Sequence, residues 1–255
     1  MATNDSAGST DRLLDELRGG NWGLQQDRDA AEKVTGVWPK GRVREALRWH
    51  DRFRSAVAEE AVSRGITAVV FGAPGFPHGD PPHLAAAGVS PQARFWYCDP
   101  DPVVTGQRAL EGWGRARAVP ASVRDPHGLL EAVGLIDAEG RWLGGGPCQV
   151  QWGLAAMVMD SGEAARAAAA YGKLLPPGSE LVIAIPDGLG GMALAWAGGG
   201  YPHVPGDVRA WCGAAGLALD RPVADVRAWG RPDMFGGLRE GAGKGRIVVA
   251  VARVP

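Results

Sequence analysis

The chain has 255 residues, enough for one large domain or for one domain with a helical extension. Its 27 Lys and Arg residues nearly balance its 28 Asp and Glu residues, and no basic block stands out. This charge pattern argues against a nucleic-acid partner. No apolar run approaches the roughly 20 residues of a membrane span, so we expect no membrane association.

Cysteine usage and the N-terminus bear on location and on metal binding. Residues 1 to 8 lack the basic and apolar regions of a signal peptide, which predicts a cytoplasmic protein. The cysteines Cys98, Cys148 and Cys212 are far apart and form no Cys-x-x-Cys pair. We expect them to be buried small hydrophobes, with no disulfide framework and no metal site.

The first quarter of the chain predicts a disordered tail over residues 1–10 and a helical cap over residues 11–64. Short helices are predicted at 11–18 and 27–34, separated by a glycine-rich turn. A long amphipathic helix follows over 42–64, because apolar residues recur there at helical spacing. These residues are Val43, Leu47, Phe53, Val57 and Ala61.

Residues 65–255 alternate between strand and helix patterns and predict one α/β domain. Strands are predicted at 66–71, 94–98, 116–119, 148–154, 180–185 and 247–254, and helices at 82–87, 102–112, 127–133, 161–175 and 207–215. Such alternation with short turns favours a doubly wound, mostly parallel sheet with helices on both faces.

The acidic turn after the second predicted strand is the most informative feature. The strand runs into Asp99-Pro-Asp-Pro102, which places Asp99 at its C-terminal tip. A carboxylate there can accept hydrogen bonds from two ribose hydroxyls, which indicates a nucleoside-type ligand. The alternative is that Asp99 is only a strand-end cap or turn former. Asp101 is predicted to cap the following helix, with Pro102 at its first position.

Several stretches, in order along nearly the whole chain, carry a family resemblance. They are Gly19-Gly20, residues 27–32, Gly75 to Pro77, His83, Tyr97, residues 99–104, Arg124 to Pro126 and the turn at 174–178. Through them the chain resembles an actinobacterial S-adenosylmethionine methyltransferase family, long catalogued as a domain of unknown function. The resemblance implies a class I, Rossmann-like methyltransferase fold behind an N-terminal helical cap.

The same resemblance implies S-adenosylmethionine as the cofactor. The implied cofactor-binding positions are Gly75, Asp99, Asp101, Ser122 and Arg124. For Arg124, a structural ion pair with Asp125 that supports a turn is the alternative to a ligand contact.

The chain departs from the family where the first strand should end in an acid and a Gly-x-Gly loop. The position of the acid is Phe71 and that of the first glycine is Ala73, followed by Pro74 and the surviving Gly75. Phe71 cannot bind an ammonium through charge, and Pro74 lacks a backbone donor. Ser122 stands where the family usually has an Asp that accepts from adenine. We therefore expect an eroded cofactor motif.

Replacement of polar residues predicts an apolar substrate pocket. Trp22 and the pair Trp49-His50 replace polar family residues, and Ala156 replaces a histidine. Together with Phe71 and Trp152 they are expected to line a pocket that suits a flat or apolar small molecule. The alternative for the tryptophans is that they fill the core.

Two histidines flank the altered loop and are candidate bases. His78 and His83 could remove a proton from a substrate hydroxyl. The alternatives are an exposed loop residue for His78 and a helix-start residue for His83. Neither Gly-x-Ser-x-Gly nor His-Glu-x-x-His occurs, which argues against hydrolase and metalloenzyme functions.

Three functions are compatible with these features. The leading hypothesis is methyl transfer to an oxygen or nitrogen of a small molecule, as a tailoring step in specialised metabolism. The second is a repurposed enzyme whose apolar pocket promotes cyclisation, isomerisation or elimination without methyl transfer. The third is a non-catalytic subunit that supports a partner methyltransferase, and a homodimer is a further expectation.

Overall fold

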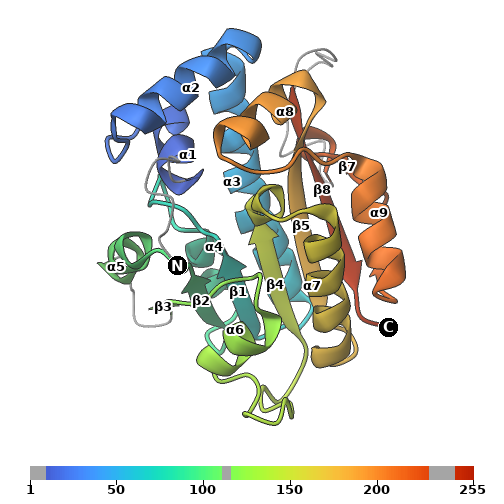
Figure 1. Cartoon of the computed structure of the whole chain (residues 1–255). Helices are drawn as coiled ribbons and strands as arrows, with labels where there is room; N and C mark the ends of the chain where they lie inside the picture. The colour runs from blue at the N-terminus through green and yellow to red at the C-terminus, as the bar shows by residue number, and fades with distance from the viewer. Residues whose placement is uncertain (1–9, 111–115, 230–244) are drawn as a thin grey trace.

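A computed structural model describes residues 10–110, 116–229 and 245–255 of the chain (Figure 1). The helices are α1 (Thr10–Arg18), α2 (Gln25–Val37), α3 (Lys40–Ser63), α4 (Pro82–Val89), α5 (Pro102–Leu110), α6 (Pro126–Ala132), α7 (Ser161–Leu174), α8 (Gly188–Ala197) and α9 (Pro205–Ala214). The strands are β1 (Ala68–Gly72), β2 (Arg94–Cys98), β3 (Ala116–Val119), β4 (Cys148–Gly153), β5 (Glu180–Asp187), β6 (Ala218–Leu219), β7 (Ala224–Asp225) and β8 (Arg246–Arg253). Short 3₁₀ turns occupy Ala155–Val158 and Val226–Ala228.

The strands form one sheet in the order β3-β2-β1-β4-β5-β8-β6, with β7 also paired to β8. The first five strands are parallel, and β8 runs antiparallel beside β5. The strand order reverses between β1 and β4. In an open parallel sheet, ligands bind at the carboxyl ends of the strands where the order reverses, so this edge is the expected ligand site.

Strand alternation divides the core between the two faces of the sheet. Val70, Cys98 and Val150 face α6, α7 and α9, whereas Val69, Phe71 and Phe95 face α3 and α4. Farther along the sheet, α1, α2 and α8 pack with α3 over β5 and β8. The predicted mostly parallel α/β sheet with helices on both faces is confirmed (Figure 1).

A buried polar chain fixes α3 against β4. Arg54 donates to the Gln151 side chain at 3.2 Å and to the Gly72 carbonyl at 3.2 Å. Gln151 donates to Gln149 at 2.8 Å, and Gln149 donates to the Glu180 carboxylate at 2.9 Å. Each of these side chains has a hydrogen-bond partner in the network, which therefore fixes α3 against the strands whose carboxyl ends form the expected ligand site.

Several local predictions can be compared with the structure. The three cysteines are buried and free, and burial raises the pKa of Cys98 to about 12. Asp101 caps α5, accepting from the Val103 amide at 2.7 Å. The ion pair of Arg124 was wrongly assigned, because Arg124 pairs with Glu163 at 2.7 Å while Asp125 caps α6. Of the predicted disordered tail, residues 1–9 lie outside the described part, and Thr10 begins α1.

Among the helices described, none combines the length and the apolar character that crossing a lipid bilayer requires.

Candidate functional site

A cavity of about 190 Å³ lies at the carboxyl edge where the strand order reverses. Three segments of the sheet edge line it, the ends of β1 and β2 and the loop after β3, together with α1 and the turn after β4. The lining residues are Thr10, Asp11, Leu14, Ala73, Asp99, Pro100, Ser122, Val123, Arg124, Leu154, Ala155 and Val158. We call this space the edge cavity.

Asp99 presents an unused acceptor to the edge cavity. Its Oδ1 accepts from the Asp101 amide at 2.9 Å, which orients the carboxylate. Its Oδ2 is buried without a hydrogen-bond partner, and the residue is 2% exposed. Burial, followed by the charge of Asp11, raises the pKa of Asp99 to about 7. A buried acceptor without a donor is costly, so this oxygen is suited to a ligand hydroxyl.

Asp11 on α1 supplies a second carboxylate to the edge cavity. Burial and the charge of Asp101 raise its pKa to about 6. A Cβ placed on Gly75 would lie 3.5 Å from Asp11 Oδ1, so this carboxylate lies beside the loop after β1. Sequence reasoning missed Asp11, because nothing local distinguishes it from any acid in the first turn of a helix.

The loop after β1 keeps a glycine-like backbone without the glycine. Ala73 has φ 41°, a left-handed conformation that is unfavourable for a residue with a Cβ. The buried guanidinium of Arg108 on α5 donates to the Gly75 carbonyl at 2.9 Å, the Pro74 carbonyl at 2.9 Å and the Phe76 carbonyl at 3.0 Å. These three bonds hold the loop in place.

Ser122 and Arg124 form the opposite wall of the edge cavity. Ser122 Oγ accepts from the Arg124 amide at 3.2 Å. The Arg124 side chain is half exposed and pairs with Glu163 on α7, so its guanidinium is directed toward that helix. Asp101 does not line the cavity, since its carboxylate caps α5.

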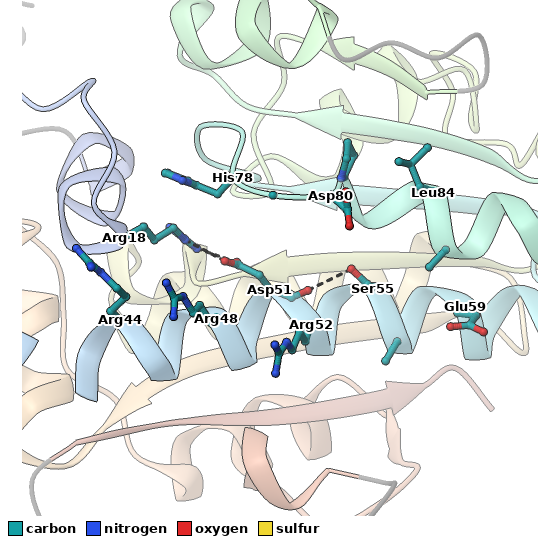
Figure 2. A pocket seen from close by; sticks show the side chains of 14 residues that line it. Arg18, Arg44, Arg48, Asp51, Arg52, Ser55, Glu59, His78, Asp80 and Leu84 are labelled. Carbon is teal, nitrogen blue, oxygen red and sulfur yellow. Dashed lines mark hydrogen bonds and ion pairs between the residues drawn. The ribbon is translucent and has the colours of Figure 1, made fainter. Parts of the chain in front are cut away.

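A second, larger space of about 960 Å³ lies between α3 and the segment that enters α4 (Figure 2). Its lining residues are Arg18, Arg44, Arg48, Asp51, Arg52, Ser55, Ala56, Glu59, His78, Gly79, Asp80, Pro81, Leu84 and Ala85. We call it the arginine cleft. Arg18 is neutralised by Asp51 through bonds of 3.0 and 2.8 Å.

His78 lies at the border of the arginine cleft and α1. Its Nε2 is 2.7 Å from the buried Asp15 Oδ1, and Asp15 Oδ2 accepts from the Trp22 amide at 2.8 Å. Burial, aided by the charge of Arg18, holds the pKa of His78 below its ordinary value despite Asp15. A neutral imidazole oriented by a carboxylate has the properties of a general base.

The sequence profile of the S-adenosyl methyltransferase family matches residues 3–187, more than half of the chain. The chain belongs to this family. No curated protein matches the sequence at a significant level.

Solved structures agree with this assignment at the level of fold. A Thermobifida fusca protein assigned as a methyltransferase is 24% identical, with a TM-score of 0.75, covering 98% of this chain and 96% of its own. A DUF574 family protein from Streptomyces avermitilis is 23% identical, with a TM-score of 0.75 and 98% coverage of both chains.

A more distant structural neighbour is an N1-methyltransferase from Burkholderia thailandensis, solved with 1,6-didemethyltoxoflavin and S-adenosylhomocysteine. It is 14% identical, with a TM-score of 0.53, covering 88% of this chain and 86% of its own. These likenesses show that the chain has the class I methyltransferase fold predicted from its sequence.

The carboxylate acceptors of the edge cavity fit the cofactor implied by this family. S-adenosylmethionine carries a ribose diol and a positive charge, and the cavity offers the free Asp99 oxygen and the Asp11 carboxylate. The fit is incomplete in size, because ligand pockets commonly span about 300–1,000 Å³ and this cavity measures about 190 Å³. A bound nucleoside would therefore extend beyond this space or require it to widen.

The remaining histidine candidates lie inside the methyltransferase core. His83 is 1% exposed, and its Nδ1 is 2.8 Å from the Tyr97 hydroxyl. His50 is 2% exposed on α3, where burial lowers its pKa. Neither lines the edge cavity or the arginine cleft, so neither is placed to contact a ligand in these spaces.

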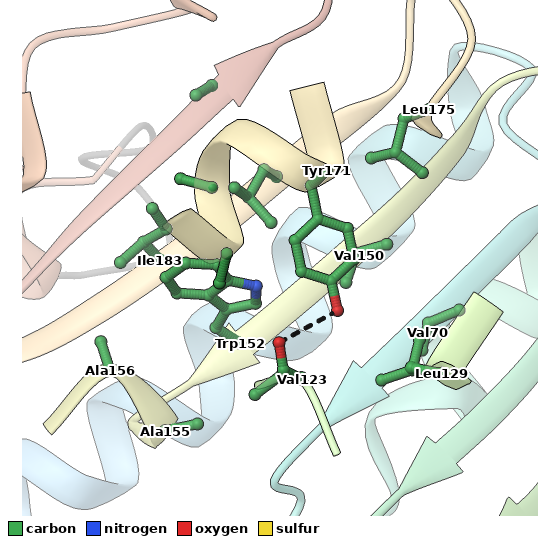
Figure 3. Close-up of a cluster of buried hydrophobic side chains, with 14 of the residues drawn as sticks. Val70, Val123, Leu129, Val150, Trp152, Ala155, Ala156, Tyr171, Leu175 and Ile183 are labelled. Atoms are coloured by element: carbon green, nitrogen blue, oxygen red, sulfur yellow. Dashed lines mark hydrogen bonds between the residues drawn. The ribbon is translucent and has the colours of Figure 1, made fainter. Parts of the chain in front are cut away.

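The structure does not bring the predicted apolar pocket residues together. Trp152 and Ala156 are fully buried in the core, with Trp152 against Tyr171 (Figure 3). Phe71 is stacked on Tyr97, with ring centroids 5.1 Å apart. The two remaining tryptophans also lie outside both spaces. Trp49, on α3, packs in the hydrophobic core formed with α1 and α2, and Trp22 stacks at the surface on Phe76.

Within residues 10–110, 116–229 and 245–255, no group of three or more His, Cys, Asp or Glu side chains is arranged to hold a metal ion.

Proposed function

We propose that this chain binds S-adenosylmethionine at the edge cavity and transfers its methyl group to an oxygen or nitrogen of a small molecule. The observation that carries the proposal is the buried, partnerless Oδ2 of Asp99 at the tip of β2. We place the reaction in the cytoplasm, as a tailoring step of specialised metabolism.

Two carboxylates on one small cavity support a cationic ligand. Asp99 would accept from ribose hydroxyls, and Asp11 would face the positively charged methionine moiety. Their raised pKa values, about 7 and about 6, reflect the cost of holding negative charge in a buried site. A bound cation offsets that cost, so the cavity favours a ligand with net positive charge. Asp11 thereby compensates for the acid missing at Phe71.

The remaining residues of the site would position the cofactor and accept the proton of the substrate. Ser122 and Val123 would border the adenine, and Arg108 would keep the loop after β1 in place. Bound S-adenosylmethionine supplies an electrophilic methyl group, whose transfer depends mainly on proximity and in-line orientation. His78 would accept the proton of the attacking hydroxyl or amine, since its lowered pKa keeps it neutral near pH 7.

The small volume of the edge cavity supports a second candidate. A family member that cannot widen this space would not bind S-adenosylmethionine and would act instead by shape alone, in a cyclisation, isomerisation or elimination.

Calorimetric titration with S-adenosylmethionine and S-adenosylhomocysteine tests the proposal. We expect binding by the wild type and by the exposed control Glu139→Gln, and at least a tenfold loss of affinity in Asp99→Ala, about 1.4 kcal/mol. Absence of binding by the wild type at millimolar cofactor would overturn methyl transfer and favour the second candidate.

A further inference from the structure

Three arginines in the arginine cleft, Arg44, Arg48 and Arg52, form no ion pair with a described residue, and Arg52 lies over the Trp49 ring. Arg44 and Arg48 make no hydrogen bond or ion pair with any described residue, and Arg44 Nε is buried without a partner. They are four residues apart on α3, so their side chains lie on the same face of the helix (Figure 2). Like charges at this spacing destabilise a helix, and no described residue neutralises the charges of Arg44 and Arg48.

The local backbone makes room for one of these guanidinium groups. A Cβ on Gly19 would lie 2.5 Å from Arg44 Nη2, so the Arg44 guanidinium packs directly against the backbone of this glycine. Arg18, on the same wall, is already neutralised by Asp51. The positive charge available to a ligand therefore comes from Arg44 and Arg48 at this end of the cleft, with Arg52 farther along α3.

The rest of the cleft limits the shape of the ligand. Ala56, Pro81, Leu84 and Ala85 provide apolar surface beyond the two arginines. Glu59 lies at the opposite end, about 22 Å from Arg44 along α3 (Figure 2). The other charged groups are Asp80 on the α4 side and Arg52, whose guanidinium lies 5.1 Å from the Trp49 ring centre.

The arginine cleft and the edge cavity adjoin the same side of α1. Asp11 and Leu14 line the cavity, and Arg18, four residues after Leu14 and about 6 Å farther along the axis, lines the cleft. The chain after β1 also borders both, through Ala73 in the cavity and His78 in the cleft. A molecule in the cleft can therefore lie beside the candidate base and next to the cofactor site.

We propose that the arginine cleft is the acceptor site and that it takes a molecule bearing an oxyanion, a carboxylate or a phosphate, on an apolar body. Arg44 and Arg48 hold the oxyanion, since guanidinium groups match the planar geometry of a carboxylate and the oxygens of a phosphate. The apolar residues before α4 contact the body of the molecule. This assignment rests on the proposed methyl transfer.

The test uses probes that differ in charge, in the absence of cofactor. Benzoate and phenyl phosphate are the anionic probes and benzamide is the neutral one, each titrated by NMR to about 20 mM. The variants are the double change Arg44→Gln with Arg48→Gln, and the control Arg209→Gln on the exposed face of α9. We expect at least one anion to bind the wild type and the control, with at least tenfold weaker binding to the double variant.

Three outcomes overturn the acceptor proposal. The first is that neither anion binds the wild type, the second is that the double variant binds the anions as the control does, and the third is that benzamide binds as well as the anions. A parallel titration with S-adenosylmethionine separates this failure from that of the proposed function. If the cofactor binds in a way that depends on Asp99 but no anion binds, only the acceptor-site proposal is overturned. If an anion binds but the cofactor does not, the proposed methyl transfer is overturned and the cleft is an anion-binding site of another function.

Discussion

Asp11 on α1 and Asp99 at the end of β2 face one small cavity, and the charge of Asp11 adds to burial in raising the pKa of Asp99 to about 7. The two residues belong to segments far apart in the sequence. Their approach concentrates negative charge at the carboxyl edge of the sheet, and the folded chain loses stability by it.

Asp99→Asn should therefore stabilise the protein without ligand. The pKa of Asp99 is raised from 3.8 to about 7, so the folded state binds the extra proton and wild-type stability falls as pH rises between these values. The variant lacks this loss, and its Asn Oδ1 can still accept from the Asp101 amide. We expect an advantage of about 1–3 kcal/mol at pH 8 that disappears near pH 4.

Urea unfolding of the wild type and Asp99→Asn across this pH range measures the difference, and comparison of the pair cancels the opposite contribution of the buried histidines. Glu139→Gln, at an exposed site, should show no such trend. A pH-independent difference for Asp99→Asn would contradict the assigned cause.

Asp11→Asn should lower the affinity for S-adenosylmethionine and make that affinity less dependent on pH. In the wild type, affinity should rise between about pH 5.5 and 7.5 as the two carboxylates ionise. Removing one of them should lower affinity at pH 7.5 by about tenfold and reduce the slope, with Arg18 and Arg108 the nearby cations that remain. Calorimetry at several pH values checks this, and an unchanged slope would show that Asp11 does not contact the ligand.

Arg108→Ala should destabilise the fold by about 2–4 kcal/mol, because three buried carbonyls lose a charged donor. Arg108→Lys should recover only part of the loss, since one ammonium cannot reproduce the fork of a guanidinium. Thermal unfolding measures both. The exposed control Arg209→Ala should stay within about 0.5 kcal/mol of the wild type.

Gly20→Ala and Gly36→Ala should shift stability in opposite directions. A Cβ on Gly20 would lie 2.1 Å from the buried Asp15 Oδ1, so that substitution should cost about 1–3 kcal/mol. Gly36 lies in α2 with nothing within 4 Å of its Cβ position, so alanine should stabilise by about 0.5–1 kcal/mol. Equal effects in chemical denaturation would show that Asp15 is not held against Gly20.

Patterns that repeat along the chain were sufficient to predict most of the fold. The apolar periodicity of residues 42–64 and the β-branched run at 247–254 correspond to α3 and β8. Helix α8 was missed, because the glycines of Gly188-Leu-Gly-Gly191 are typical of a loop. The antiparallel direction of β8 depends on the path of the chain, which local sequence does not specify.

The candidate site was predictable only where a single segment forms it. Asp99 follows directly from the end of a strand, whereas Asp11, Arg108 and Arg44 reach their positions through tertiary packing. The alternation of side chains along β4 could have predicted that Trp152 is a core residue. Val150 and Trp152 are two positions apart on β4 and face the same core, so a tryptophan there is core rather than pocket.

Helix α5 joins two walls of the edge cavity into one mechanical unit. Thr105 Oγ1 donates to the Asp99 carbonyl at 2.9 Å at its start, and Arg108 binds the loop after β1 near its end. Asp99 and that loop are therefore both anchored to the same helix. A substitution that shifts α5 should therefore disturb Asp99 and this loop together, whereas Asp11 is held separately on α1.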